Sequence, residues 1–366
     1  MKIECVQEKL QIILAQAEKI SSRAVNLPVL SCILFEAKNG KLHIRSTNLD
    51  LGFQTALPVK IEEEGVAAVP AALLSSFVAA IPREKSVVLV SDGKTLQVTT
   101  KKTKSVIKCM PHDDFPTIPD ITKDHSFEIE AQDFVKGLKA VWYSSSVSSV
   151  KPELSSVYIY KEEGEVVFVA TDSFRLAEKK IKVKGHAEFD HLLIPFKNIG
   201  EIIRILESAQ GVVEVRVSKH QIAIVFGDTY LTSRVIDGTF PDYRQIIPKE
   251  FKTEAVLLKE DLAHSLKMAQ IFSDTFNQVS LSIDPSAKRF ELTTKNATLG
   301  ENTTALDAAL SGEPAESNFN YRYIADCLQS IATDSLSVSL SGPSRPVVVR
   351  GVSDKSFTYL VMPMNR

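Results

Sequence analysis

The chain has 366 residues, which is enough for two or three domains that each bury a core. Hydrophobic residues make up 44% of it and charged residues 24%, an ordinary globular composition. Its 43 basic and 45 acidic side chains leave a formal net charge of -2, which argues against a generally basic nucleic-acid coat but allows a local basic face.

The first third of the chain predicts a helix, a β-hairpin, a second helix and a second hairpin, in that order. Residues 10–17 place apolar side chains at the spacing of one buried helical stripe. Residues 33–44 read as two strands around Asn39-Gly40, a strong type I′ turn signal. Residues 69–77 indicate the second helix, and Asp92-Gly93 turns the second hairpin.

The same order of elements recurs twice more, so the chain reads as three copies of one unit. Pro70, Pro195 and Asn320 are evenly spaced at the start of the second helix, where proline is suited because its missing N–H would be unpaired. Each first hairpin leads into a threonine-rich strand, near residues 47, 171 and 294. The later copies have helices at 134–141, 194–199, 262–269 and 319–324, and hairpin turns at 163–164, 219–220, 284–286 and 342–343.

This repetition predicts an α+β fold of three similar domains, each of about 120 residues, a normal domain size. The expected boundaries lie in polar segments close to prolines, which gives domains at residues 1–122, 126–249 and 253–366.

No constellation of residues suited to catalysis is visible. The seven histidines lie far apart and show no metal-ligand spacing. Gly93-Lys94-Thr95 resembles the end of a phosphate-binding loop, but Val88 stands where the loop needs its first glycine. No G-x-S-x-G elbow occurs. We expect no enzymatic activity, no metal and no cofactor; an enzyme with an unrecognised site is the alternative, and a pocket of titrating residues would support it.

The chain carries no recognisable targeting or membrane segment. Its first residues lack the apolar core of a secretory signal, and its longest apolar run, residues 66–74, is too short to span a membrane. The four cysteines are scattered and form no C-x-x-C pair, which suits reduced thiols. We expect a cytoplasmic protein without membrane association.

Three short stretches stand out from the repeated pattern. Residues 169–177, Val-Ala-Thr-Asp-Ser-Phe-Arg-Leu-Ala, end a strand on a polar triplet, which taken alone indicates a simple strand-to-turn transition. Residues 238–244, Gly-Thr-Phe-Pro-Asp-Tyr-Arg, form a turn whose direction Pro241 sets. Residues 359–364 form an apolar strand with a methionine-rich end, whereas most termini are polar.

In this order and at these spacings, the three stretches resemble the bacterial sliding clamp family, the β subunits of the replicative DNA polymerase, and the resemblance runs from Met1 to Arg366. It implies a homodimeric ring in which helices line a channel around duplex DNA and antiparallel sheets form the outside. It also implies a non-catalytic processivity factor that slides without sequence specificity, tethers the replicative polymerase and is loaded by an ATP-driven clamp loader.

The resemblance further implies a groove that binds peptides of the polymerase, the clamp loader and other clamp-motif proteins. Methionine side chains can repack around different partners, which suits such a surface. Ser173-Phe174 departs from the Gly-His of many family members, and the larger ring could narrow the groove. The alternative is that these residues complete a core between two domains. The implied groove residues are Leu154, Thr171, Ser173, Phe174, Arg175, Leu176, Pro241, Gln245, Ile246, Pro346, Val361, Met362, Pro363 and Met364.

Charge alone does not predict DNA binding, because the basic residues are diffuse. A sliding protein needs a few weak phosphate contacts and no base-specific ones. By resemblance, the DNA-contact candidates are Arg23, Ser149, Lys151 and Lys197. The loop that holds Ser149 and Lys151 lacks the aromatic residues of some family members.

The resemblance places the dimer interface between the first and third domains. Ile271 and Phe272 follow the third amphipathic helix, and Ile107 lies on the expected partner strand. A monomeric scaffold that binds peptides without encircling DNA is the alternative to a ring.

Overall fold

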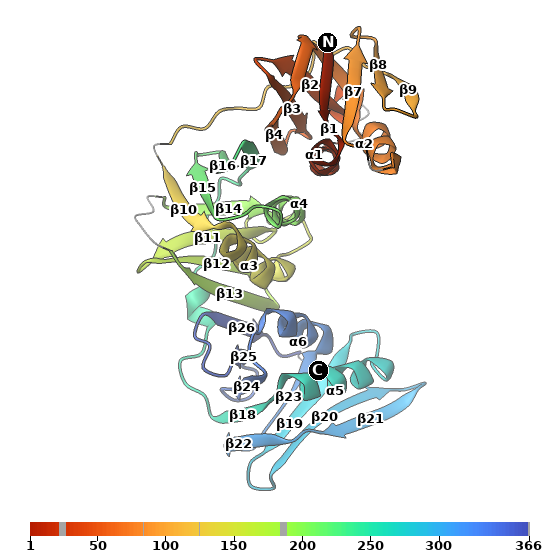
Figure 1. The fold of residues 1–366 in the computed structure, drawn as a ribbon. Coiled ribbons are helices and arrows are strands. Elements are labelled where there is room, and N and C mark those ends of the chain that lie inside the picture. The colour runs from red at the N-terminus through yellow and green to blue at the C-terminus, as the bar shows by residue number, and fades with distance from the viewer. Residues whose placement is uncertain (22–26, 83, 124, 184–188, 365–366) are drawn as a thin grey trace. The chain divides into compact units, whose positions relative to one another are not determined.

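The structure is a computed structural model that describes the chain except residues 22–26, 83, 124, 184–188 and 365–366. It forms two compact units, and each is described by itself. Figure 1 labels the helices and strands in chain order. The first unit comprises Met1–Gln132, Lys184–Phe189 and Lys197–Val235, and the second comprises Asp133–Val183, Asp190–Phe196 and Ile236–Arg366.

The described residues of the first unit form two antiparallel sheets. One has the strand order β5-β1-β7-β8-β9, and the other has the order β10-β15-β16-β17-β4-β3-β2-β6. The strands are β1 (Lys2–Val6), β2 (Cys32–Lys38), β3 (Lys41–Thr47), β4 (Leu51–Pro58), β5 (Lys60–Glu63), β6 (Gly65–Pro70), β7 (Ser86–Ser91), β8 (Thr95–Thr99), β9 (Lys104–Lys108), β10 (Ser126–Glu130), β15 (Val212–Val217), β16 (Gln221–Phe226) and β17 (Thr229–Arg234). The helices are α1 (Gln7–Ile20), η1 (Pro28–Ser31), α2 (Ala71–Ala80) and most of α4 (Phe196–Leu206).

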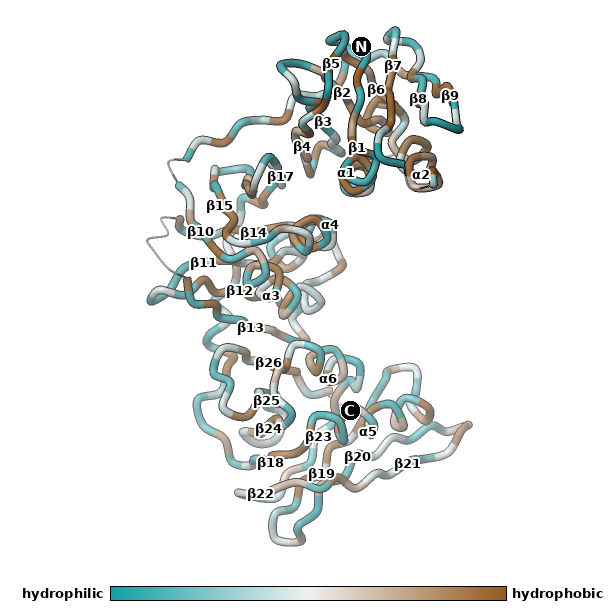
Figure 2. Tube along the Cα trace, viewed as in Figure 1, coloured by the Kyte–Doolittle hydropathy of each residue, from teal (hydrophilic) through white to brown (hydrophobic). Residues whose placement is uncertain are grey.

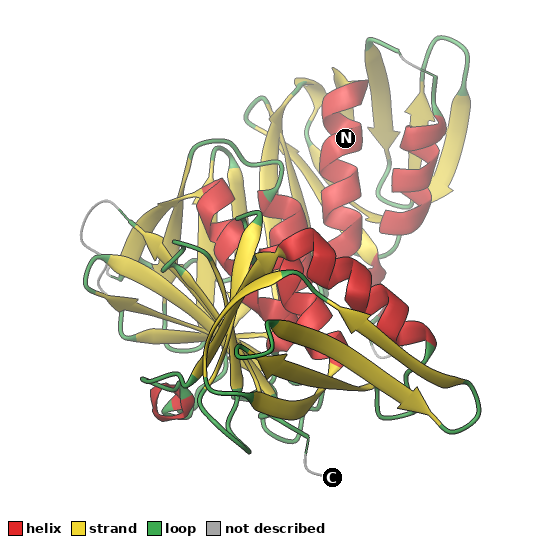
Figure 3. Ribbon diagram, turned by 90° about the horizontal axis from the view of Figure 1, so that it is seen from below, coloured by secondary structure: helices red, strands yellow, loops and turns green. Residues whose placement is uncertain are grey.

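Helix α1 forms because its apolar residues recur on one face and bury together. Leu10, Leu14, Ala17 and Ile20 are completely buried against β3, β4 and the neighbouring helix α2, and Figure 3 shows these helices beside the strands. The hydroxyl of Ser46 donates to the Ala17 carbonyl over 2.7 Å, which joins helix to strand. Helix α2 carries no charged side chain, and Figure 2 shows it largely brown.

The described residues of the second unit also form two antiparallel sheets. Their strand orders are β14-β11-β12-β13-β26-β25-β24-β18-β22 and β21-β20-β19-β23. The strands are β11 (Ser156–Glu162), β12 (Glu165–Thr171), β13 (Arg175–Lys182), β14 (His191–Pro195), β18 (Thr253–Leu258), β19 (Gln278–Asp284), β20 (Arg289–Asn296), β21 (Gly300–Ala305), β22 (Ala308–Gly312), β23 (Ala315–Asn320), β24 (Ser335–Leu340), β25 (Val347–Gly351) and β26 (Phe357–Val361). The helices are α3 (Ala131–Val141), η2 (Trp142–Ser144), η3 (Tyr243–Ile246), α5 (Lys259–Ile271), α6 (Tyr321–Cys327) and η4 (Leu328–Ser330).

Strands β13 and β26 bring distant parts of the sequence together within the nine-stranded sheet. Arg175 pairs with Val361, and Lys179 pairs with Phe357. The segment after β17 covers one face of this sheet, because Phe240 packs with Leu176 and Leu360 in one buried cluster. Successive residues of a strand face opposite sides, so each strand supplies both faces.

Helix α3 packs on the opposite face of β12. Val167 and Val169 belong to the cluster on the first face, so Phe168 between them points the other way. There the Phe134 ring of α3 meets the Phe168 ring edge to face, with 5.6 Å between centroids. Gly137 leaves the space that the ring needs, because a Cβ there would lie 2.5 Å from Phe168.

The predicted hairpins and helices are present, with one shift at the helix starts. Asn39-Gly40 and Glu163-Gly164 have the positive φ angles of type I′ turns: 52° and 75° in the first, 47° and 82° in the second. Pro70 and Pro195 are the last residues of β6 and β14, one position before the helices that follow. Asn320 precedes α6 in the same way, and its side chain caps the helix by accepting the Arg322 N–H.

The threonine-rich segments are not separate strands, which corrects the prediction. They end β3, β12 and β20, and each runs into a turn because an Asn or Asp side chain captures the next backbone N–H groups. Oδ1 of Asn48, Asp172 and Asn296 accepts two such N–H groups in each turn, at 2.7 to 3.2 Å. In the first two turns, the residue after the Asn or Asp has a left-handed backbone conformation, with φ of 74° at Leu49 and 77° at Ser173.

Candidate functional site

The turn between β12 and β13 is held by side chains of its own residues. Asp172 accepts the N–H groups of Phe174 and Arg175 at 2.9 and 3.0 Å. The Thr171 hydroxyl donates to the Arg175 carbonyl over 2.6 Å and accepts the Ser173 N–H. The turn therefore keeps its shape and leaves the Phe174 side chain 61% exposed.

The end of the chain continues past β26 along this turn. The Met362 N–H donates to the Phe174 carbonyl over 2.8 Å, and the Met364 N–H donates to the Asn318 carbonyl over 2.7 Å. The backbone thus places the methionine-rich tail, including Pro363, beside the turn. The three tail side chains are partly exposed.

A cavity of about 370 Å³ opens next to the tail. Four residues expected in the groove line it: Gln245, Ile246, Pro346 and Met362. Their neighbours in the lining are Pro248, Ser341, Ser344 and Arg345, and nothing in the sequence singled these out.

Several expected groove residues are buried and do not line this cavity. Leu176 and Val361 are completely buried, and Leu154 and Thr171 are nearly so. Pro241 lines a different cavity, of about 440 Å³, together with Tyr158 and residues of η3.

Residues 238–244 also have a structural role, because two of their aromatic rings and one hydroxyl pack into the second unit. Phe240 stacks on Tyr158, with centroids 4.7 Å apart and planes 3° from parallel. The Tyr243 hydroxyl donates to the buried Glu178 carboxylate over 2.5 Å. Burial and the nearby Glu178 charge raise the pKa of Tyr243, so the hydroxyl stays protonated and keeps donating.

The guanidinium of Arg175 lies beneath the turn and is only 12% exposed. Nε contacts Asp172 at 3.0 Å, Nη1 contacts Asp326 at 2.5 Å, and Nη2 donates to the Tyr143 carbonyl over 2.6 Å. The Tyr323 ring lies 4.5 Å from the guanidinium carbon. Sequence reasoning missed Tyr143, Tyr323 and Asp326, because they come from segments far from the turn.

The DNA-contact candidates lie in different settings. Arg23 falls outside the described residues. Lys197, at the start of α4 in the first unit, pairs with Asp50 at 2.6 Å and is 65% exposed. Ser149 and Lys151 lie in an exposed loop of the second unit, between η2 and β11.

The interface candidates differ in exposure. Ile107 lies on the edge strand β9, but its side chain is 5% exposed and belongs to the core of its own unit. Val106, its neighbour, is 61% exposed and is the apolar side chain that this strand presents. Ile271, at the end of α5, is 66% exposed, and Phe272 is partly buried.

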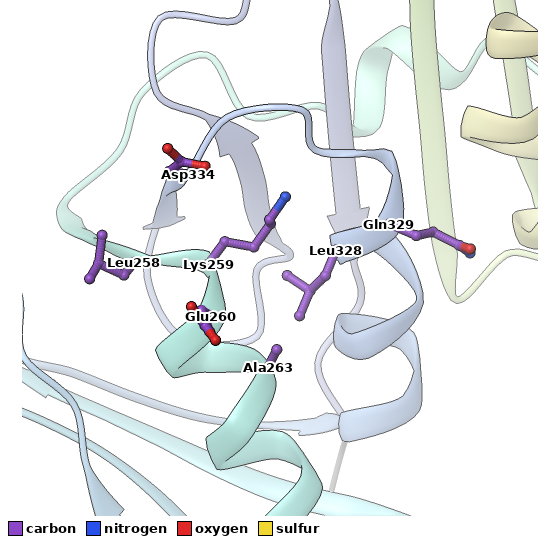
Figure 4. Close-up of a pocket in the computed structure, with 7 residues that line it drawn as sticks. All are labelled: Leu258, Lys259, Glu260, Ala263, Leu328, Gln329 and Asp334. Carbon is purple, nitrogen blue, oxygen red and sulfur yellow. The ribbon is translucent and has the colours of Figure 1, made fainter.

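A third cavity, of about 510 Å³, lies at the start of α5 and contains none of the expected site residues. Figure 4 shows its lining, with Gln329 pointing away from the other side chains. Its one cation, Lys259, donates to the Ile331 carbonyl over 2.8 Å. Across the described parts of the chain, no group of histidines, cysteines or acidic residues could hold a metal ion, and no helix is long and apolar enough to cross a membrane.

Three family models match consecutive parts of the chain. They are the N-terminal, central and C-terminal domains of the DNA polymerase III beta subunit, at residues 1–119, 128–242 and 244–365. The Beta sliding clamp of Synechococcus elongatus is 28% identical, over 100% of this chain and 99% of its own length. The Beta sliding clamp of Escherichia coli is 25% identical over 92% of each chain.

Solved structures show the same fold. The DnaN sliding clamp of Bartonella birtlesii, bound to griselimycin, is 26% identical with a TM-score of 0.94. Caulobacter crescentus pol III beta is 27% identical with a TM-score of 0.91. Each comparison covers 100% of both chains.

Proposed function

Because this chain belongs to the DNA polymerase III beta subunit family, the sliding clamps, we propose that two copies close into a ring around duplex DNA. The observation that carries the proposal is the match of three family models, in order, along one chain. As a sliding clamp the protein is a processivity factor and not an enzyme. We assign its domains to residues 1–122, 126–249 and 253–366.

The groove would tether the replicative polymerase, the clamp loader and other clamp-motif proteins by short extended peptides. The cavity supports this role because Ile246, Pro346 and the flexible Met362 supply part of its lining, and the Met362 N–H bonds to the carbonyl of the exposed Phe174. Leu176 and Val361 would form its base. Removing residues 362–366 should weaken peptide binding and leave the fold intact, because β26 ends at Val361. Calorimetry with a peptide carrying Gln and a Leu-Phe pair measures the loss, and equal affinity would contradict the assignment.

DNA would be held by topology and by a few phosphate contacts. Arg23, Ser149, Lys151 and Lys197 are the proposed contacts. Lys197 already pairs with Asp50 on an exposed surface, so it would exchange that carboxylate for phosphate at little cost. Such contacts are independent of base sequence and allow sliding.

The two chains would meet through the edge strand β9 of one and the end of α5 in the other. The apolar side chains at this contact would be Ile271 and Phe272 from one chain and Val106 from the other. Ile107 would support β9 from within its own core. An ATP-driven loader would open this contact, and the protein would act in the cytoplasm.

The test of encirclement is release from DNA at high salt. Phosphate contacts weaken by orders of magnitude over a modest rise in salt, whereas a closed ring leaves only by opening or by sliding off an end. Protein loaded on a closed circle should therefore stay in gel filtration at high salt and be lost after the circle is cut. Equal loss from both forms would mean that the chain does not encircle DNA and would favour a peptide-binding scaffold.

A further inference from the structure

Position 175 differs in kind from the equivalent positions of the other two copies. Three residues after the Asn or Asp that forms each turn, the first copy has Leu51 and the third has Leu299, whereas the middle copy has Arg175. Leu51 is buried in the core, whereas Leu299 is 61% exposed. Arg175 is buried like Leu51, with 12% of its side chain exposed, so its charge needs partners, because an unpaired buried charge is costly.

Arg175 has those partners. Each of its three nitrogens has one: Asp172 at 3.0 Å, Asp326 at 2.5 Å and the Tyr143 carbonyl at 2.6 Å. The Tyr323 ring stacks on the guanidinium with 4.5 Å between its centroid and the central carbon. With 12% of the side chain exposed, little of it remains for a bound peptide.

The partners belong to two separate segments of the chain. Asp172 and Tyr143 lie in the middle copy, whereas Tyr323 and Asp326 lie on α6 of the third copy. The Arg175 guanidinium therefore joins the Ser173–Phe174 turn to helix α6.

The backbone on both sides of this joint holds the methionine-rich tail. The turn accepts the Met362 N–H at the Phe174 carbonyl, and β23 accepts the Met364 N–H at the Asn318 carbonyl. A shift of α6 and β23 relative to the turn would pull these two tail contacts apart.

The charge of Arg175 persists in this setting. Burial alone would lower its pKa. Tyr359, Asp326 and Asp172 outweigh burial and raise the pKa above its ordinary value.

We propose that Arg175 is a positioning residue that makes no contact with the peptide: with Asp326, it holds the Ser173–Phe174 turn and the methionine tail in the binding geometry. This inference rests on the proposed peptide-binding role of the groove. A preformed groove avoids the ordering cost of binding, so loss of the joint would weaken affinity without removing any peptide contact.

The test is a double-mutant cycle on peptide affinity, measured by anisotropy with a labelled peptide carrying Gln and a Leu-Phe pair. Asp326→Asn keeps the side-chain volume and removes the charge, and Arg175→Ala removes the joint. Each should weaken binding by about tenfold, a change of about 1.4 kcal/mol. The double variant should have the same peptide affinity as the single variant that binds less tightly, because the two substitutions remove the same joint.

Two further readouts separate positioning from a general loss of structure. Hydrogen exchange at the Met362 amide should speed up in both variants, because its acceptor at Phe174 is no longer held in place. Arg175→Lys should recover part of the affinity, because an ammonium can still pair with Asp326. Arg204→Ala removes an ion pair of an exposed arginine, with Glu201 in the first unit, and should change neither readout.

Normal or tighter binding by Asp326→Asn, combined with weak binding by Arg175→Ala, would overturn the proposal, because Arg175 would then contact the peptide directly. Unchanged Met362 exchange in both variants would also overturn it. Failure of the unmodified protein to bind the peptide would instead remove the peptide-binding role, and Met362 exchange would still report whether the joint exists.

Discussion

The side chain and the backbone of Phe174 have separate tasks. The carbonyl accepts the Met362 N–H, whereas the ring is 61% exposed and has no core role. An exposed aromatic ring on a residue that is hydrogen-bonded to Met362, which lines the 370 Å³ cavity, is the kind of residue that anchors a partner. Ser173 supports this arrangement in a left-handed conformation, with φ of 77°.

Phe174→Ala should weaken peptide binding by about 2 kcal/mol, the loss of one aromatic anchor. The free energy of unfolding should change by less than about 0.5 kcal/mol, because an exposed ring stabilises little. Calorimetry and thermal unfolding measure the two quantities. Leu176→Ala is a poor substitute for this test, because Leu176 is completely buried and its loss would destabilise the fold itself. Peptide affinity equal to that of the unmodified protein would exclude Phe174 from the groove.

At the scale of single elements, two helical glycines differ in the space around them. Gly137 of α3 faces the Phe168 ring, where a Cβ would lie at 2.5 Å. Gly200 of α4 has no heavy atom within 4 Å of such a Cβ. Helix propensity alone would favour alanine at both positions by about 1 kcal/mol.

Gly200→Ala should therefore stabilise the protein by about 1 kcal/mol. Gly137→Ala should destabilise it by about 1–3 kcal/mol, because an overpacked core must shift a buried ring. Chemical unfolding of both variants measures the difference. Stabilisation by both substitutions would show that the α3 contact with Phe168 adjusts freely.

Elements that depend on neighbouring residues could be read from the sequence, and those that depend on distant partners could not. Asn39-Gly40 and Glu163-Gly164 predicted their hairpins, because turn chemistry is local. Val106 and Ile107 are consecutive apolar residues of β9. Only the way in which β9 pairs with β8 determines that Ile107 is buried and Val106 is exposed. The partners of Arg175 come from α6, which no local pattern connects to the turn.

The whole molecule depends, in the proposed ring, on contacts between chains. Ile271→Ala with Phe272→Ala should yield a monomer in light scattering, because the exposed apolar end of α5 would lose its partner. Val106→Lys should do the same from the other side. Leu258→Ala is the matched control: Leu258 is 52% exposed but lines the separate cavity of Figure 4, so the mass should stay that of a dimer. A dimer in the first two variants would place the interface elsewhere.

Two strand ladders join parts of the chain that lie far apart in sequence. In the first unit β17 pairs with β4, and in the second unit β13 pairs with β26. A force that separates these strands is therefore shared by a row of backbone hydrogen bonds, which must break together. In the proposed ring, we therefore expect the contact between the two chains to open before either ladder does, because the backbone is continuous within each chain and not between chains.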